Sequence, residues 1–278
     1  MIPGKAVLVT VLFVATALFL AGCTNGSNNQ IESLKISGST TLLPVVEKAA
    51  SEYMLENKSV DIVLSGGGSS VGVKAAGEGT ADIGMSSREV KSSEIAQYPM
   101  LNVVPVAKDG ITIIVNPSNT ISHLSLEQLR GIYNGTYTNW NQVGGSGGTI
   151  VVIGRDSTSG TREFFTSAVM KGGNSTPGML EKNSNGGVKQ TVSQTPGAIG
   201  YVGMGFADSA VKAVKLDVNG TLYEATEQNV LSGAYPLSRY LYVMTNGNAT
   251  PAEQAFIVYL LGPVGKRIDR EEGFVPLP

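Results

Sequence analysis

Short apolar segments alternate with segments of helical periodicity along most of this chain, and this alternation is the strongest constraint on its fold. The helical segments carry apolar residues three and four positions apart, as in 44–56, where Pro44 stands in the first turn. The predicted strands are 34–36, 60–64, 82–85, 103–106, 111–115, 149–154, 198–202 and 237–245, and the predicted helices are 44–56, 69–76, one that begins at Ser125, 161–170 and 251–261. This order predicts an α/β fold with mostly parallel sheets.

Hydroxyl-rich and glycine-rich loops follow several of the predicted strands. They occupy residues 37–41, 65–70, 86–88 and 155–162, the last with the sequence RDSTSGTR. Helix N-termini leave backbone N–H groups unpaired and carry a partial positive charge, so they attract anions. Glycine lets the backbone approach a ligand, and hydroxyl groups add further donors. The pattern therefore predicts an anion site that several loops form together.

A purely structural explanation is open for each loop taken alone, because serine and threonine are the usual N-cap residues of helices. The recurrence of such loops in one chain favours the anion site. Arg155 strengthens it, since it directly follows a predicted strand and its guanidinium can hold an oxyanion by two parallel hydrogen bonds. Arg162 lies one step into the helix, a position typical of a surface or salt-bridge residue.

The composition argues against several other classes of protein. Charged residues make up 15% of the 278 residues, the formal net charge is −2, and the chain has no cluster of lysine and arginine, so no nucleic-acid partner is expected. The single histidine, His123, and the single cysteine, Cys23, leave no zinc-ligand spacing. No Gly-x4-Gly-Lys-Ser/Thr phosphate loop is present. We therefore expect neither a metal nor a cofactor.

The N-terminus has the features of a targeting segment. Lys5 is the only charge in the first 30 residues, an apolar run follows at 6–21, and small residues precede Cys23. This arrangement resembles the lipobox of prokaryotic lipoproteins, in which the cysteine is lipidated. We expect a lipoprotein signal peptide at 1–22, a lipid on Cys23 that holds the protein at the outer face of the cell membrane, and a polar tether at 23–30. The alternative is an uncleaved anchor, although the run is short for a span of about 20 residues.

Taken in order, the polar motifs resemble those of the phosphate-binding proteins of ABC importers, a branch of the type II periplasmic binding proteins. The motifs are SGSTTLLP at 37–44, GGSS at 67–70, ADIGMSSR at 81–88, RDSTSGT at 155–161, PGAIGYV at 196–202 and PLSRYLY at 236–242. Each motif alone is weak, but the ordered set covers the chain from about residue 31 to its end.

The resemblance implies two α/β lobes with mixed, mostly parallel sheets, helices on both faces and the ligand in the cleft between the lobes. The first lobe would comprise 31–106 and 238–278, and the second lobe 107–237. It also implies a monomer that binds inorganic phosphate without catalysis and delivers it to the membrane subunits of an ABC permease. The implied phosphate ligands are Thr40, Thr41, Ser69, Arg155, Ser159, Gly160 and Thr161, with Ser39, Ser70, Ser87 and Asp156 as weaker candidates.

The chain departs from the family pattern at two places. Familiar members have an acid at the position of Ser87, where it accepts the proton of bound phosphate and so excludes sulfate, which has no proton to donate. Asp156 either takes over part of the role of that acid or only pairs with Arg155. In the RDSTSGT motif, Ser157 and Thr158 replace an acid and a glycine, and threonine enters positive φ less easily than glycine. Binding of a broader range of oxyanions, such as sulfate or molybdate, therefore stays open.

Two further functions are compatible with the sequence. A sensor that responds to the same anion would carry the same site as an importer component. A serine hydrolase is the remote alternative, because residues 68–72 match the Gly-x-Ser-x-Gly nucleophile motif with Ser70 at its centre. Its only possible histidine base is His123, which stands before a predicted helix where a surface histidine is ordinary.

Overall fold

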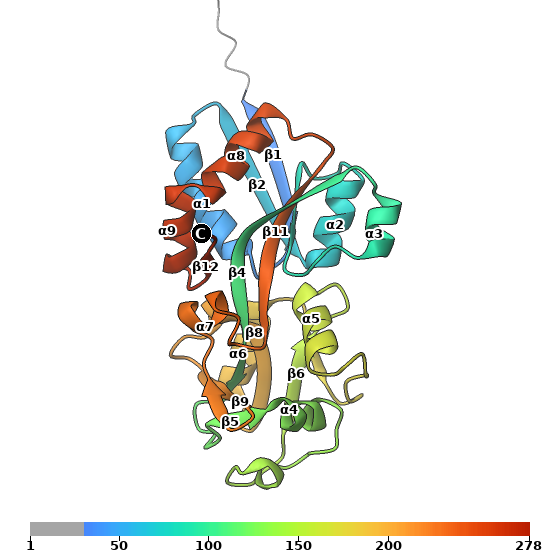
Figure 1. Ribbon diagram of the computed structural model, residues 1–278, viewed down its shortest axis with the longest axis vertical. Coiled ribbons are helices and arrows are strands. Elements are labelled where there is room, and N and C mark those ends of the chain that lie inside the picture. Colours follow the sequence, from blue (N-terminus) through green and yellow to red (C-terminus); the bar gives the residue numbers. More distant parts are fainter. Residues whose placement is uncertain (1–30) are drawn as a thin grey trace, which may run out of the picture. The chain divides into compact units, whose positions relative to one another are not determined.

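Two long strands, β4 (Leu101–Val115) and β11 (Ser238–Asn246), run antiparallel through the middle of the fold and connect its two halves (Figure 1). The computed structural model describes residues 31–278. The expected signal peptide at 1–22, Cys23 and the tether at 23–30 lie outside the described residues. Within residues 31–278, no helix combines the length and the apolar character needed to cross a bilayer.

The first half is a mixed sheet with helices on both sides. Its strand order is β2 (Val60–Gly67), β1 (Glu32–Gly38), β3 (Ile83–Ser86), β11 and β4. The helices α1 (Leu43–Glu56), α8 (Pro251–Leu261) and α9 (Pro263–Glu271) lie on one side, and α2 (Ser69–Gly77) and α3 (Ser92–Gln97) lie on the other (Figure 1). The main core of this half joins Leu34, Ile36, Val46, Val243 and Phe256, all nearly inaccessible to solvent.

The second half is built on the far end of β4. There β4 pairs antiparallel with β8 (Ala198–Gly203) and β9 (Lys212–Val218), and β6 (Val151–Arg155) pairs parallel with β8 and with β7 (Leu180–Lys182). The remaining elements of this half are β5 (His123–Ser125), α4 (Leu126–Tyr133), the 3-10 helix Trp140–Val143, α5 (Gly160–Ala168), α6 (Asn185–Gln194), the 3-10 helix Met204–Phe206, β10 (Thr221–Tyr223) and α7 (Glu227–Leu231). Stacked rings of Phe165 and Tyr201, 4.2 Å apart, lie in its core. The short strand β12 (Val275–Pro276) follows α9 and pairs with the first-half part of β4.

The α/β class and the order of most elements agree with the prediction. Helix α8 has the predicted bounds, and Ser125 caps α4 by accepting a hydrogen bond from the backbone N–H of Gln128. The sheet is mixed, and among the strands of residues 31–278 six pairs are antiparallel and five are parallel, because β4 and β11 run against all of their neighbours. The prediction of mostly parallel sheets gave too little weight to these two connecting strands.

Strand β4 differs most from expectation. Residues 103–106 and 111–115 were predicted as two separate strands, on either side of Asp109 and Gly110. Instead the strand continues through these two residues, and Asp109 is fully buried. Its carboxylate accepts two hydrogen bonds from the guanidinium of Arg239 on β11, at 2.6 and 2.9 Å. A buried carboxylate needs such a partner, and the ion pair makes a continuous strand possible here.

Helices α6 and α9 were not among the predicted elements. The sequence of α6 contains Gly186 and Gly187 in its first turn, which lowers its intrinsic helix propensity. Its stability comes instead from the burial of Val188 and Val192 against Ile114, Ile153 and Val202. Tertiary packing therefore determines this helix, and sequence periodicity alone does not reveal it.

The pH dependence of stability should depend on Asp269 of α9. This side chain is buried, one carboxylate oxygen has no hydrogen-bond partner among residues 31–278, and burial raises its pKa to about 7. The native state therefore keeps a proton that the unfolded chain releases at lower pH, so the free energy of unfolding falls as the pH rises from about 4 to 7. We expect Asp269→Asn to raise the free energy of unfolding by roughly 2–4 kcal/mol at pH 8 and by little at pH 4.

Denaturant unfolding at the two pH values measures this effect. The matched control is Asp61→Asn, which removes an exposed carboxylate from β2. An Asp269→Asn gain of the same size at pH 4 and at pH 8 would contradict the proposed titration.

Candidate functional site

The N-terminal ends of α1, α2 and α5 meet between the two halves, and each brings a polar loop. The loop after β1 supplies Ser39, Thr40 and Thr41, the loop after β2 supplies Ser69, and the loop after β6 supplies Thr161. Strand β3 ends at Ser86 and is followed by Ser87. These side chains form the polar cluster, which we define as Thr40, Thr41, Ser69, Ser87, Arg155, Thr161, Asn185, Arg239 and Asp109.

Hydrogen bonds join the two halves directly inside the polar cluster. Thr41 Oγ1 of the first half lies 3.1 Å from Thr161 Oγ1 of the second half, and Arg155 Nη2 donates to Thr40 Oγ1 at 3.1 Å. Next to them, the backbone N–H of Ser70 donates to Thr158 O at 3.1 Å. The structure is therefore that of a closed arrangement, in which the polar loops of both halves touch.

Gly160 permits the closest of these approaches. A Cβ atom at this position would lie 2.3 Å from Ser69 Oγ, well inside van der Waals contact. A residue with a side chain would push the start of α5 away from the start of α2. Gly160 thus allows the predicted site residues of the two halves to come together.

Arg155 is the central cation of the polar cluster. It is 1% exposed, its Nε donates to Lys182 O at 3.2 Å, and its Nη2 donates to Asn183 O at 3.2 Å. Its Nη1 is buried and has no hydrogen-bond partner among residues 31–278. Burial lowers the pKa of the guanidinium to about 10, and the nearby charge of Asp156 opposes this shift. Arg155 therefore remains positively charged at neutral pH and presents a free donor.

Asp156 does not neutralise Arg155 through a direct ion pair. Its Oδ1 accepts a hydrogen bond from the backbone N–H of Thr158 at 3.0 Å and lies 2.7 Å from the Thr158 hydroxyl. The carboxylate is thus turned toward its own loop. Thr158 does not adopt a positive φ. Within 31–278, the only non-glycine residues that do are Lys171 and Asn219. The hydroxyl of Thr158 instead lies 2.8 Å from Gly67 O, across the contact between the halves.

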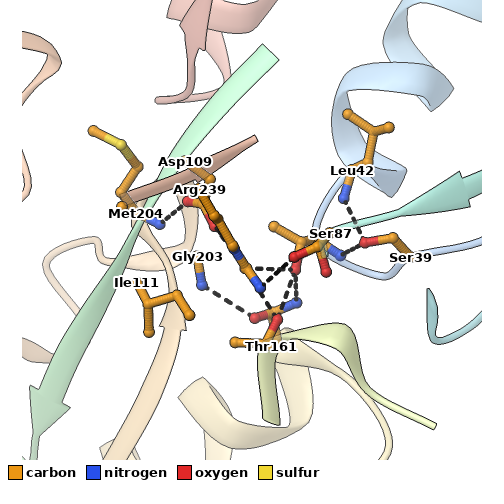
Figure 2. Close-up of polar contacts among 12 residues, drawn as sticks. Ser39, Leu42, Ser87, Asp109, Ile111, Thr161, Gly203, Met204 and Arg239 are labelled. Carbon is orange, nitrogen blue, oxygen red and sulfur yellow. Dashed lines mark hydrogen bonds and ion pairs between the residues drawn. The ribbon is translucent and has the colours of Figure 1, made fainter. Parts of the chain in front are cut away.

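The ion pair of Asp109 and Arg239 was absent from the predicted site. Arg239 is 5% exposed, and besides Asp109 it donates to Ser87 O at 2.8 Å and to Thr161 Oγ1 at 3.0 Å (Figure 2). Burial lowers the pKa of Arg239, an effect that the carboxylate of Asp109 opposes. The available signals were Asp109, the one acidic residue of β4, and Arg239, the one charged residue of β11.

Asn185 was also missed. It is fully buried at the start of α6, and its Nδ2 donates to Thr40 Oγ1 at 3.3 Å and to Thr41 Oγ1 at 3.0 Å. The helix it begins was not predicted, so its position in the fold could not be derived. The polar run Asn183–Ser184–Asn185 was the only sequence signal for it.

Serine residues of the predicted site have two different roles. Ser69 Oγ accepts a hydrogen bond from the backbone N–H of Ser87 at 2.9 Å and lies 3.2 Å from Ser87 Oγ. Ser159 caps α5 by accepting a hydrogen bond from the backbone N–H of Arg162, and Ser39 accepts one from the backbone N–H of Thr41 in the loop before α1. A cap keeps its own hydroxyl proton, so Ser159 can still donate to a ligand.

Ser70 belongs to a second network beside the polar cluster. Its hydroxyl accepts a hydrogen bond from Arg88, which also pairs with Glu94 at 2.7 Å and with Glu163 of α5 at 2.9 Å. A surface cavity of about 460 Å³ opens here, lined in part by Arg88, Glu163, Arg239 and Tyr240. Its lining includes Arg239 of the polar cluster but not Thr40, Arg155 or Thr161, so this cavity is a neighbouring groove.

The residues of the hydrolase alternative are not brought together. Ser70 lies at the start of α2 in the first half, whereas His123 is exposed on β5 in the second half, where its Nδ1 lies 3.1 Å from the hydroxyl of Ser122 (Figure 1). No group of three or more histidine, cysteine or acidic side chains within 31–278 is arranged to hold a metal ion. The geometry therefore favours a site that binds an anion through many donors.

Comparison with known proteins agrees with this geometry. Residues 24–264 match the family model of the PBP superfamily domain. The chain is 34% identical to the phosphate-binding protein PstS of Bacillus subtilis, over 91% of this chain and 83% of that protein.

Two solved structures are similar in fold and sequence. One is a candidate phosphate ABC transporter substrate-binding protein from Clostridium perfringens, solved with bound phosphate (35% identity, TM-score 0.83, 89% of this chain and 100% of that chain). The other is an ABC-type phosphate transport receptor from Vibrio cholerae (32% identity, TM-score 0.72, 88% of this chain and 100% of that chain). This chain therefore belongs to the PBP superfamily and, within it, to the family of the phosphate-binding protein PstS.

Proposed function

We propose that this protein captures inorganic phosphate between its two halves and delivers it to the membrane subunits of an ABC permease. The observation that carries the proposal is Arg155, a buried cation with a free Nη1 donor and no direct carboxylate partner among residues 31–278. Such a charge is costly unless an anion compensates it. The names of the relatives identify phosphate as the anion.

The proposed phosphate ligands are the seven residues expected from the sequence: Thr40, Thr41, Ser69, Arg155, Ser159, Gly160 and Thr161. They provide hydroxyl groups, backbone N–H groups at helix N-termini and one guanidinium, all suitable donors for a dianion. Micromolar affinity requires about −8 kcal/mol, and each hydrogen bond to a charged group contributes roughly 1.5–3 kcal/mol. The donor set is therefore large enough to support tight binding and closure of the halves.

Closure is the proposed signal to the permease. The lobes would comprise 31–106 with 238–278, and 107–237, with β4 and β11 as the connection. Phosphate that contacts donors from both lobes favours the closed form, and the permease would bind that form. This role is binding without catalysis, because the anion must leave unchanged.

The cellular arrangement completes the proposal. The protein would act as a monomer outside the cytoplasmic membrane, tethered through a lipid on Cys23 at the start of the mature chain. A sensor of phosphate that uses the same site is the second candidate, favoured by the same donors. Binding alone does not distinguish the two roles, whereas transport in reconstituted vesicles with the permease does.

Calorimetric titration of residues 31–278, freed of phosphate, tests the binding site. We expect tight phosphate binding by the wild type and a loss of at least about 100-fold in affinity for Arg155→Met, because two or more charge-assisted hydrogen bonds disappear. The matched control is Arg130→Met, which removes a partly buried arginine that donates to Val169 O away from the polar cluster. Equal affinity of wild type and Arg155→Met would remove Arg155 from the site.

Selectivity should respond to the residue at position 87. Ser87 is 2% exposed, so a carboxylate placed there would lie among the donors of the polar cluster. An ionised acid accepts the proton of hydrogen phosphate but repels sulfate, which has no proton to donate. We expect Ser87→Asp to raise the preference for phosphate over sulfate by about 100-fold or more.

Competition titration with sulfate measures this preference. Ser232→Asp, which adds the same charge at an exposed position, serves as the control. An unchanged ratio of the two affinities in Ser87→Asp would show that residue 87 does not face the bound anion.

A further inference from the structure

The side chain of Asn185 contacts two of the predicted phosphate ligands, Thr40 and Thr41. Its Nδ2 donates to Thr40 Oγ1 and to Thr41 Oγ1, and its Oδ1 accepts a hydrogen bond from the backbone N–H of Gly203 at 3.1 Å. Only an oxygen can accept from that N–H group, so the orientation of the amide is determined. Both amide hydrogens must then point at the two threonine oxygens.

Thr40 has no lone pair left for a ligand. A hydroxyl group has two lone pairs and one hydrogen. Thr40 Oγ1 accepts one hydrogen bond from Asn185 and a second from Arg155 Nη2 at 3.1 Å. Its own hydrogen is therefore the only group that it can offer, and this hydrogen must be donated.

The count for Thr41 and Thr161 is less restrictive. Arg239 Nη2 has two hydrogens, and its short contacts are with Asp109 Oδ2 at 2.6 Å and Thr161 Oγ1 at 3.0 Å, whereas Thr41 Oγ1 lies 3.4 Å away. Thr41 Oγ1 accepts from Asn185 at 3.0 Å and lies 3.1 Å from Thr161 Oγ1, and either hydroxyl group can be the donor of this last contact. The pair therefore keeps one hydrogen and one lone pair for a ligand, whichever direction the bond takes.

We propose that Asn185 is a positioning residue that keeps the hydroxyl group of Thr40 as a donor and so favours an anion oxygen that carries no proton at this position. This inference rests on the proposed function of the polar cluster. Thr40 can serve an unprotonated oxygen only, which leaves other hydroxyl groups, such as those of Ser69 and Ser87, to accept a ligand proton. An unprotonated oxygen of hydrogen phosphate or sulfate suits Thr40, whereas a protonated oxygen of dihydrogen phosphate does not.

Asn185→Ala tests the inference through selectivity. Without the amide, lone pairs of Thr40 and Thr41 become available, so the variant can accept ligand protons that the wild type cannot. Sulfate should lose affinity by about 10-fold more than phosphate at pH 6, where dihydrogen phosphate is abundant. The weakening of phosphate binding between pH 8 and pH 6 should also be smaller in the variant than in the wild type.

Asn116→Ala is the matched control. Asn116 is a buried asparagine of the same half whose Nδ2 donates to Val192 O and Ser193 O at the other end of α6. Its loss should lower stability without changing the ratio of the two anion affinities. If Asn185→Ala weakens phosphate and sulfate by the same factor, or leaves the pH profile unchanged, the positioning role is wrong.

Asn185→Asp provides a second test that preserves the shape of the side chain. Its carboxylate would accept hydrogen bonds from Thr40 and Thr41 and turn their hydrogens away from the anion. Sulfate binding should fall at least about 100-fold, and more than in Asn183→Asp, which adds the same charge nearby without contacting the threonines. Sulfate affinity equal to that of Asn183→Asp would contradict the inference. A wild type that binds neither anion would instead overturn the proposed function itself, and this inference with it.

Discussion

The buried ion pair of Asp109 and Arg239 is the interaction on which the rest of the site depends. It joins β4 and β11, the two strands that pass between the halves, at a contact of 2.6 Å. From this position Arg239 also reaches Ser87 O of the first half and Thr161 Oγ1 of the second. One guanidinium thus holds together the connection between the halves and the loops that close on each other.

The two buried arginines of the polar cluster have different charge environments. Arg239 pairs with the carboxylate of Asp109 and stabilises the contact between β4 and β11. Arg155 has a neighbouring acid in Asp156 that faces its own loop, and it retains a free donor. The charge of Arg239 is already compensated by the carboxylate of Asp109, whereas the charge of Arg155 is not. An anion is therefore attracted mainly to Arg155. This division explains how a chain with a net charge of −2 can still attract an anion.

Much of this arrangement could be predicted from the sequence because local signals carried it. Hydroxyl groups and glycine before predicted helix starts indicated the strand-to-helix loops around Thr40, Ser69 and Thr161. The alternation of predicted strands and helices indicated the α/β class. The prediction of two strands on either side of Asp109 was wrong because the arginine that compensates this buried carboxylate lies 130 residues away in the sequence. Asn185 was missed because α6 depends on tertiary packing, which no local pattern reports.

A crystal structure of residues 31–278 with phosphate is the most direct test of the claim that Arg155 and the threonine donors form one interlobe anion site. We predict a phosphate oxygen within hydrogen-bonding distance of Arg155 Nη1, with Thr40 and Thr161 hydroxyls contacting the same anion from opposite halves. Phosphate bound elsewhere, or Arg155 Nη1 paired with a carboxylate of the protein in the complex, would contradict it.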